Sequence, residues 1–255
     1  MTDYVDYAAP GTVRTRGTVI VVPGRGESAA SYARFGARVA ADAYRVRVVA
    51  PIAGRADLDV AVDDLCHALT AAVAGLVHDG LTRPLVLVGA DAGAATLGAL
   101  LARSGPGAQW WPDAVVLAGL PGHVALGEGT WDSELDLRTH CPVHRGVLGD
   151  DPDVAPGSLS SALAADLLDA AYGSEAAVPH LLLTGDDDPL SDRTALAGLA
   201  KSLPAARLTV VHGAHHDVLN DLQHRSVAAE VVTYLEALRN GPTLTPILHV
   251  ETSSW

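Results

Sequence analysis

Hydrophobic residues along the chain fall into short β-branched runs that are separated by longer, alanine-rich segments with helical spacing. The runs are continuously apolar, which is typical of strands buried on both faces of a sheet. Strands that alternate with amphipathic helices predict βαβ units and a mostly parallel sheet. We expect strands at 17–22, 44–50, 84–88, 113–118, 180–184 and 207–211, and helices at 28–42, 58–78, 92–103, 191–202 and 217–238.

One segment, residues 120–178, interrupts this alternation. It is rich in Gly, Pro, His and acidic residues and contains one helical stretch, 158–171. A connection of this length inside a compact domain is usually a functional lid. We therefore predict an α/β core formed by residues 1–119 and 179–240, a cap at 120–178 and an irregular C-terminal arm at 241–255.

Composition narrows the class of protein. A chain of 255 residues that is 49% hydrophobic and only 4% aromatic can bury a large aliphatic core. The formal net charge of −13 argues against binding to nucleic-acid phosphates or to anionic lipid. The longest apolar runs are too short or too interrupted by glycine to predict membrane insertion, and no secretory signal segment is recognisable.

Cysteine usage points to a reducing compartment. Cys66 and Cys141 are too few for a disulfide framework, so we expect a cytoplasmic protein. Its expected partner is a small-molecule substrate, and the sequence is compatible with either a monomer or a homo-oligomer.

The stretch LVLVGADAGAAT (85–96) places an acid, Asp91, between a predicted strand and a predicted helix. Gly89 and Ala90 precede it, and Ala92 and Gly93 follow. Small residues on both sides are required at a nucleophile elbow, because the strand and helix backbones nearly touch there. An aspartate that only caps the helix N-terminus fits the same letters. This stretch alone supports both interpretations equally.

Two further motifs favour the elbow. LLLTGDDDPLSD (181–192) places Asp188 in a turn just after a strand, and VVHGAHHDVLND (210–221) places His215 and His216 after the next one. Nucleophile, acid and histidine then follow the chain order of elbow hydrolases. Each follows a different strand, where open α/β sheets place their sites. We therefore predict that Asp91, Asp188 and one of these histidines form one site.

The glycine turn PGRGES (23–28) suits two functions. Its backbone amide at Arg25, together with that of Ala92, predicts a two-donor oxyanion hole. The same glycines fit the dinucleotide fingerprint G-x-G-x-x-G/A. That fingerprint requires an acid near the end of the next strand, which here ends Val48-Val49-Ala50-Pro51. We therefore expect no cofactor.

Eleven histidines also raise the question of a metal. His140-Cys141-Pro142-Val143-His144 and the His212–Asp217 stretch have ligand-like spacing, but neither has a second ligand pair at zinc-motif spacing. We expect no metal, and interpret His140 and His144 as packing or substrate-contact residues of the cap. The candidate contacts for a small or medium apolar substrate are Trp110, Trp111, Trp131, Leu135, His140 and His144.

Over nearly all of residues 17–238 the chain resembles α/β-hydrolases, and most of all their monoacylglycerol lipase and lysophospholipase-like branch. PGRGESAASYARFGARVAADAYRV is similar to that branch's HGxGE-type oxyanion turn and following helix. GAHHDVLND is similar to its histidine loop and GDDDPL to its acid turn, which selects His216 over His215 and selects Asp188. Two positions depart from the pattern: Pro23 replaces a histidine, and Asp91 replaces the elbow serine.

An elbow aspartate resembles epoxide hydrolases and haloalkane dehalogenases. Those proteins carry tryptophan after the aspartate, where this chain has Ala92, and epoxide hydrolases use two cap tyrosines, whereas residues 120–178 contain only Tyr172. The resemblance implies a cofactor-free hydrolase with Asp91 as nucleophile or base, His216 as base and Asp188 as its orienting acid. The alternatives are a non-catalytic ligand-binding protein and an esterase or lipase-type acyl hydrolase. Carboxylates on both sides of His216 also predict a raised pKa for its imidazole.

Overall fold

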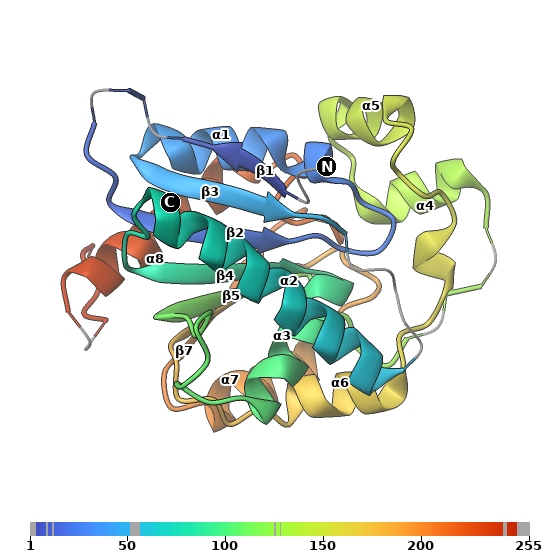
Figure 1. Cartoon of the computed structure of the whole chain (residues 1–255). Helices are drawn as coiled ribbons and strands as arrows, with labels where there is room; N and C mark the ends of the chain where they lie inside the picture. The colour runs from blue at the N-terminus through green and yellow to red at the C-terminus, as the bar shows by residue number, and fades with distance from the viewer. Residues whose placement is uncertain are drawn as a thin grey trace, which may run out of the picture.

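A seven-stranded sheet forms the centre of the molecule (Figure 1). Its strand order is β1-β3-β2-β4-β5-β6-β7; β1 is antiparallel to β3, and the other neighbouring pairs are parallel. The strands are β1 (Tyr4–Tyr7), β2 (Gly17–Val22), β3 (Tyr44–Val49), β4 (Leu85–Ala90), β5 (Ala114–Ala118), β6 (His180–Gly185) and β7 (Ala206–Val211). This computed structural model describes residues 4–8, 10–11, 13–51, 57–124, 126–127, 129–241 and 244–248.

The six predicted strands are confirmed to within two residues at each end. The additional strand, β1, is only four residues long and half-buried, so its sequence lacks the apolar run that marks the others. It is anchored through Asp6, which accepts hydrogen bonds from Nε and Nη2 of the fully buried Arg47 at 2.7 and 2.6 Å.

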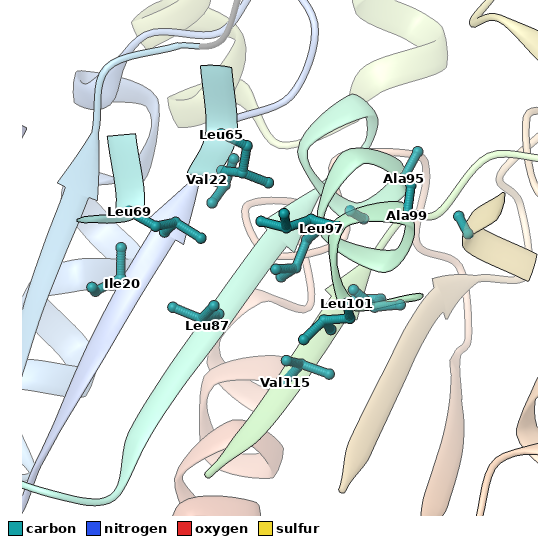
Figure 2. Close-up of a cluster of buried hydrophobic side chains, with 14 of the residues drawn as sticks. Ile20, Val22, Leu65, Leu69, Leu87, Ala95, Leu97, Ala99, Leu101 and Val115 are labelled. Atoms are coloured by element: carbon teal, nitrogen blue, oxygen red, sulfur yellow. The ribbon is translucent and has the colours of Figure 1, made fainter. Parts of the chain in front are cut away.

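Helices cover both faces of the sheet. On one face, α2, α3, α6 and α7 bury an aliphatic cluster against the sheet. Figure 2 shows its members on α2 and α3 above the strands. On the other face, α1 and α8 bury a second cluster that includes Phe35, Val39, Val227 and Val231. The helices are α1 (Ala33–Ala41), α2 (Leu58–Asp79), α3 (Ala92–Arg103), α4 (Trp131–Arg138), α5 (Pro142–Asp150), α6 (Ala165–Tyr172), α7 (Arg193–Ser202) and α8 (His224–Arg239), with 3₁₀ turns η1 (Ala29–Tyr32) and η2 (Ser158–Ser160).

Three predicted helices differ from the structure. The 28–42 helix begins as the 3₁₀ turn η1, which Ser28 caps by accepting a hydrogen bond from the Ala30 amide. The 158–171 helix is divided into η2 and α6. The 217–238 helix begins only at His224, because residues 217–223 form a loop in which the buried Asp221 carboxylate binds groups of the cap.

The segment predicted as a cap contains two kinds of structure. Helices α4 and α5 lie beyond the carboxyl ends of the strands (Figure 1) and share a small apolar cluster formed by Leu135, Leu148 and Val154. Helix α6 instead packs in the main core through Leu167 and Leu168. The part that covers the carboxyl edge therefore ends near η2. Of the predicted C-terminal arm, residues 241 and 244–248 are described and contain no helix or strand, and the rest lies outside the described residues.

Helix α2 is long and apolar enough to span a membrane by length and composition, contrary to the sequence-based expectation. Its 18-residue window has a mean hydropathy of 1.6. The helix nevertheless packs Leu65, Leu69 and Leu76 against the sheet with no exposed surface. Burial of that face explains the apolar sequence, as in the core helix of a globular domain.

Candidate active site

Asp91 occupies a sharp turn between β4 and α3. Its backbone has φ 45° and ψ −117°, a left-handed conformation that a non-glycine residue rarely adopts. Such strain costs on the order of 1–3 kcal/mol and is concentrated at functional sites. The Asp91 side chain makes no capping hydrogen bond to α3. The geometry is therefore that of an elbow, and the helix-cap interpretation of Asp91 does not hold.

The small residues around Asp91 are required by close backbone contacts. A Cβ on Gly89 would lie 2.6 Å from the Gly93 carbonyl oxygen. A Cβ on Gly93 would lie 2.5 Å from the carbonyl oxygen of Val22, at the end of β2. Both distances are shorter than any real contact of a Cβ, so glycine alone fits this crossing of strand and helix.

The structure brings Asp91, His216 and Asp188 together at the carboxyl edge of the sheet. His216 Nε2 lies 3.0 Å from Asp91 Oδ1, and His216 Nδ1 lies 3.1 and 3.0 Å from the two Asp188 carboxylate oxygens. All three side chains are buried. The Asp188 carboxylate is oriented by the Leu190 amide, which donates to its Oδ1 at 2.9 Å. A carboxylate that fixes a histidine ring is the arrangement of a catalytic triad.

Arg25 binds the same carboxylate with its backbone and its side chain. Its amide donates to Asp91 Oδ2 at 2.8 Å, its Nε donates to Oδ2 at 2.9 Å, and its Nη2 donates to Oδ1 at 2.7 Å. The amide was the expected oxyanion donor, and here Asp91 itself accepts from it. The second expected donor, Ala92, begins α3 directly after the elbow. The sequence suggests that the Arg25 side chain could neutralise a carboxylate of the site, but it does not place the guanidinium, because the contact joins residues 66 positions apart.

The charges in this group balance each other. Burial lowers the pKa of His216, but the charge of Asp188 and the hydrogen bonds to Asp188 and Asp91 outweigh it and raise the pKa to about 10. Burial raises the pKa of Asp91, but the charge of Arg25 and the hydrogen bonds from His216 and Arg25 hold it well below its ordinary value. At neutral pH the site therefore contains an imidazolium and a guanidinium beside two carboxylates.

A second buried network lies behind the glycine turn formed by residues 23–28. Glu27 accepts from the Gly24 amide at 2.9 Å and from the Tyr32 hydroxyl. Burial and the negative charge of Asp217 raise the pKa of Glu27 to about 7. Arg138 donates from Nη2 to the Arg25 carbonyl oxygen at 2.6 Å, which ties helix α4 to the turn. This network holds the turn that presents the Arg25 amide.

Part of this network has the composition of a metal site. Among the described residues, Glu27, His144 and Asp217 bring ligand atoms within 4.8 Å of one another. The Asp217 carboxylate already lies 3.0 Å from His144 Nε2 and 3.5 Å from Arg138 Nη1. Because a guanidinium repels a metal cation, the arrangement favours an internal ion network.

The predicted substrate contacts lie elsewhere. Trp110 is buried in the main core and packs against Trp111, just before β5 and so at the amino edge of the sheet, opposite Asp91. Trp131 and Leu135 pack in the small cluster of the cap. His140 is exposed and stacks on His215, and His144 is buried against Asp217.

The space beside Asp91 is small in this conformation. A cavity lined by Asp91, His216, Tyr32 and Leu219 among others has a volume of about 10 Å³, which is enough for about one water molecule. A molecule larger than water therefore enters this cavity only if some of its lining residues move.

The sheet order, the strained elbow and the acid–histidine pair on successive loops define an α/β-hydrolase. The chain belongs to the family of the serine aminopeptidase S33, whose model matches residues 13–223. No curated protein sequence matches the chain.

Solved structures of this fold include lipases. A monoacylglycerol lipase from Paleococcus ferrophilus is 16% identical, with a TM-score of 0.69 over 92% of this chain and 98% of that one. A soluble variant of monoglyceride lipase from Saccharomyces cerevisiae, in complex with a substrate analog, is 16% identical, with a TM-score of 0.72 over 92% and 91%. E-2-(acetamidomethylene)succinate hydrolase is 15% identical, with a TM-score of 0.63 over 91% and 94%. At these identities the likeness concerns the fold.

Proposed function

We propose that this chain is a hydrolase in which Asp91 is the nucleophile and forms an ester with its substrate. The observation that supports the proposal is that the two carboxylate oxygens of Asp91 have different partners. Oδ2 accepts from the Arg25 amide, and Oδ1 lies 3.0 Å from His216 Nε2. In the ester, Oδ2 becomes the carbonyl oxygen, and during hydrolysis it becomes the oxyanion. The Arg25 amide already donates a hydrogen bond to this atom.

In the first step Oδ1 attacks a saturated carbon of the substrate. A bond forms between Oδ1 and that carbon, and the leaving group departs with the electron pair of its former bond. Asp91 becomes a neutral ester. One of the two carboxylates that hold the proton on His216 is thereby lost, so the pKa of His216 falls from about 10 and the proton leaves to solvent.

In the second step neutral His216, oriented by Asp188, takes a proton from water. The water oxygen attacks the ester carbonyl carbon, and the negative charge develops on Oδ2, where the Arg25 amide donates. When the bond between the carbonyl carbon and Oδ1 breaks, His216 returns its proton to the departing alcohol. One oxygen of the regenerated Asp91 carboxyl group then comes from water, and the remaining proton of that water passes to His216, which restores the imidazolium beside the Asp91 carboxylate.

The electrostatics favour this route over the alternatives for an enzyme. As a general base Asp91 is weak, because its pKa is held well below the ordinary value. His216 is protonated in the resting site and is no base until Asp91 loses its charge. Acyl transfer from an ordinary ester to Asp91 would give an anhydride, which is a much less favourable intermediate.

A non-catalytic role is the second candidate, and the Arg25 guanidinium favours it. The ion pair covers both oxygens of Asp91, and the adjacent cavity holds about one water molecule. In such a protein the four charged groups would serve only to stabilise the fold.

The test is a single turnover in water enriched in heavy oxygen, with an epoxide, a haloalkane, a lactone and an ester as substrates, each in one form that bears a carboxylate and one that does not. Mass analysis of the peptide that carries Asp91 should show incorporated label. Turnover without label in Asp91 would reject the ester route. Absence of turnover with all four substrates would support the non-catalytic role.

Two variants of the acid turn sharpen this test. Asp188→Asn should slow hydrolysis of the ester by about 10³–10⁴-fold, so that the ester accumulates and adds the alkyl mass to the protein. Asp187→Asn is the matched control, since Asp187 is the exposed neighbour on the same turn. Equal effects of both variants would exclude a specific role for Asp188.

A further inference from the structure

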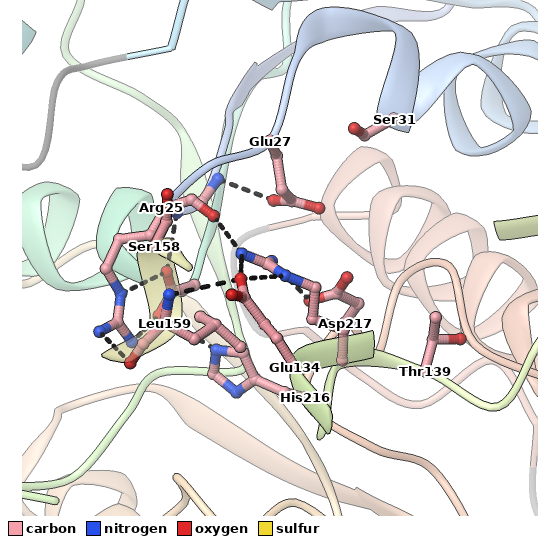
Figure 3. A network of polar contacts seen from close by, with 12 residues as sticks. Arg25, Glu27, Ser31, Glu134, Thr139, Ser158, Leu159, His216 and Asp217 are labelled. Carbon is pink, nitrogen blue, oxygen red and sulfur yellow. Dashed lines mark hydrogen bonds and ion pairs between the residues drawn. The ribbon is translucent and has the colours of Figure 1, made fainter. Parts of the chain in front are cut away.

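The Arg25 side chain joins the elbow to the cap. While Nε and Nη2 bind Asp91, Nη1 donates to the carbonyl oxygens of Ser161 at 2.5 Å and Leu159 at 3.4 Å, in and just after η2 (Figure 3). The side chain is only 6% exposed. The glycine turn also meets this segment through the Ala155 amide, which donates to the Gly26 carbonyl oxygen at 2.9 Å. Arg25 therefore holds the cap closed over the carboxylate that it neutralises.

Arg25 and Asp91 are not equally dependent on each other. If the guanidinium leaves, Asp91 keeps the His216 imidazolium at 3.0 Å on Oδ1 and the Arg25 amide on Oδ2. The guanidinium has no other carboxylate within the hydrogen bonds described and would keep only cap carbonyls. A buried charge that loses its partner is strongly destabilising. Opening of the site thus requires a new anion on Arg25.

The shape of the ion pair indicates which anion fits. Nε and Nη2 form one edge of the planar guanidinium, and this edge now binds a planar carboxylate through two parallel hydrogen bonds. A carboxylate of an incoming molecule would meet the same two donors at the same separation. A neutral apolar molecule would offer nothing to the uncovered cation.

We propose that the substrate carries a carboxylate that takes the guanidinium of Arg25 from Asp91 and so frees Oδ1 to attack a nearby carbon of the same molecule. This inference rests on the proposed role of Asp91 as nucleophile. It replaces the expectation of an apolar substrate, whose predicted tryptophan contacts lie away from the site. Arg25 is then the residue that selects the substrate.

The experiment measures binding without turnover, so that failure of the nucleophile proposal does not affect it. Sodium acetate is titrated into the wild-type chain and into Asp91→Asn, with sodium chloride at equal ionic strength as the reference, and the melting temperature Tm is recorded. In Asp91→Asn the internal carboxylate that competes for Arg25 is gone. Acetate should therefore bind this variant at least tenfold more tightly than it binds the wild-type chain.

The double variant Arg25→Gln/Asp91→Asn is the matched control and should lose the acetate effect. If Asp91→Asn is too unstable for an affinity to be fitted, a single concentration of acetate should still raise its Tm more than chloride does at equal ionic strength. Equal affinity of wild type and Asp91→Asn for acetate would overturn the proposal. Retention of acetate binding in the double variant, or preference of Asp91→Asn for inorganic phosphate over acetate, would overturn it as well.

Discussion

At the scale of single residues, an elbow carboxylate changes the state of the histidine beside it. A serine hydroxyl leaves an elbow histidine with one carboxylate partner, whereas Asp91 and Asp188 give His216 two. The two carboxylates hold the proton on the ring in the resting site, and in the mechanism that we propose the histidine becomes a base only after Asp91 is neutralised. The pKa of this ring is therefore the property that distinguishes the site from a serine triad.

This difference predicts how stability depends on pH. In the unfolded chain the imidazole titrates near 6.5, and in the folded chain it titrates at about 10. Below the lower value both states hold the proton and the contribution is complete. Between the two values only the folded state holds it, so this site's contribution to the free energy of unfolding falls by about 1.4 kcal/mol per pH unit as pH rises.

The measurement is urea unfolding of the wild-type chain and of His216→Asn at pH 7, 8 and 9. The difference between the two should decrease with pH at about that slope. His212→Asn is the control, because the His212 side chain is 92% exposed. A constant difference between wild type and His216→Asn would show that His216 is neutral in the folded protein.

At the scale of elements, the sequence predicts best where burial is apolar and local. Strands β2 to β6 are buried almost throughout and follow directly from continuous apolar runs, whereas the edge strand β7 is half-buried along its length. Helix α4 was not predicted, because it buries two polar side chains, Glu134 and Arg138, which pair at 2.8 Å. A pattern of hydrophobic positions counts such residues as solvent-facing. The opposite error occurred at the Asp217–Asp221 loop. It was predicted as helix because Val218 and Leu219 continue the apolar pattern of α8.

The residues of the candidate site were likewise predicted only in part. Asp91, Asp188 and the pair His215–His216 were found because each follows a predicted strand, and the carboxyl ends of parallel strands share one edge. The resemblance to the lipase branch then selected His216. The Arg25 side chain could not be placed, since its contacts to Asp91 and Ser161 depend on how the cap closes.

The close backbone contact between the start of α3 and the end of β2 gives a prediction about stability. Gly93→Ala should lower the free energy of unfolding by about 1–3 kcal/mol, because its Cβ would meet backbone atoms of Val22 and Pro23 that cannot move independently. Gly146→Ala, on the exposed side of α5 with nothing within 4 Å, should stabilise the protein by about 0.5–1 kcal/mol. Denaturant unfolding of both variants checks this, and equal stability of the two would contradict it.

At the scale of the whole molecule, the cap and the core are joined by buried polar contacts. The Asp221 carboxylate is fully buried and accepts from the Thr139 hydroxyl, the His140 amide and both the amide and ring of His215. These four bonds connect the end of α4 to the histidine loop. Movement of the cap must therefore disturb the loop that carries His216.

Removal of this carboxylate should loosen the cap while the sheet stays intact. In Asp221→Ala, amide hydrogen exchange in α4 and α5 should accelerate at least fivefold, because an unsatisfied buried group costs about 1–3 kcal/mol. Exchange in β4 and β5 should be unchanged. Asp153→Ala, at an exposed cap position, is the control. Uniform acceleration in cap and sheet would show that the two parts open together.

The ion pair between Arg25 and Asp91 also bears on how such a chain evolves. A mutation that places serine at position 91 would leave a buried guanidinium without its carboxylate, and loss of one partner in a buried pair costs about 3–5 kcal/mol. Replacement of Arg25 alone would leave Asp91 with fewer donors and the cap without its link to the elbow. Each single substitution is therefore destabilising, so selection acts on the two positions together. In a chain with this ion pair, a serine at position 91 is tolerated best when Arg25 changes as well.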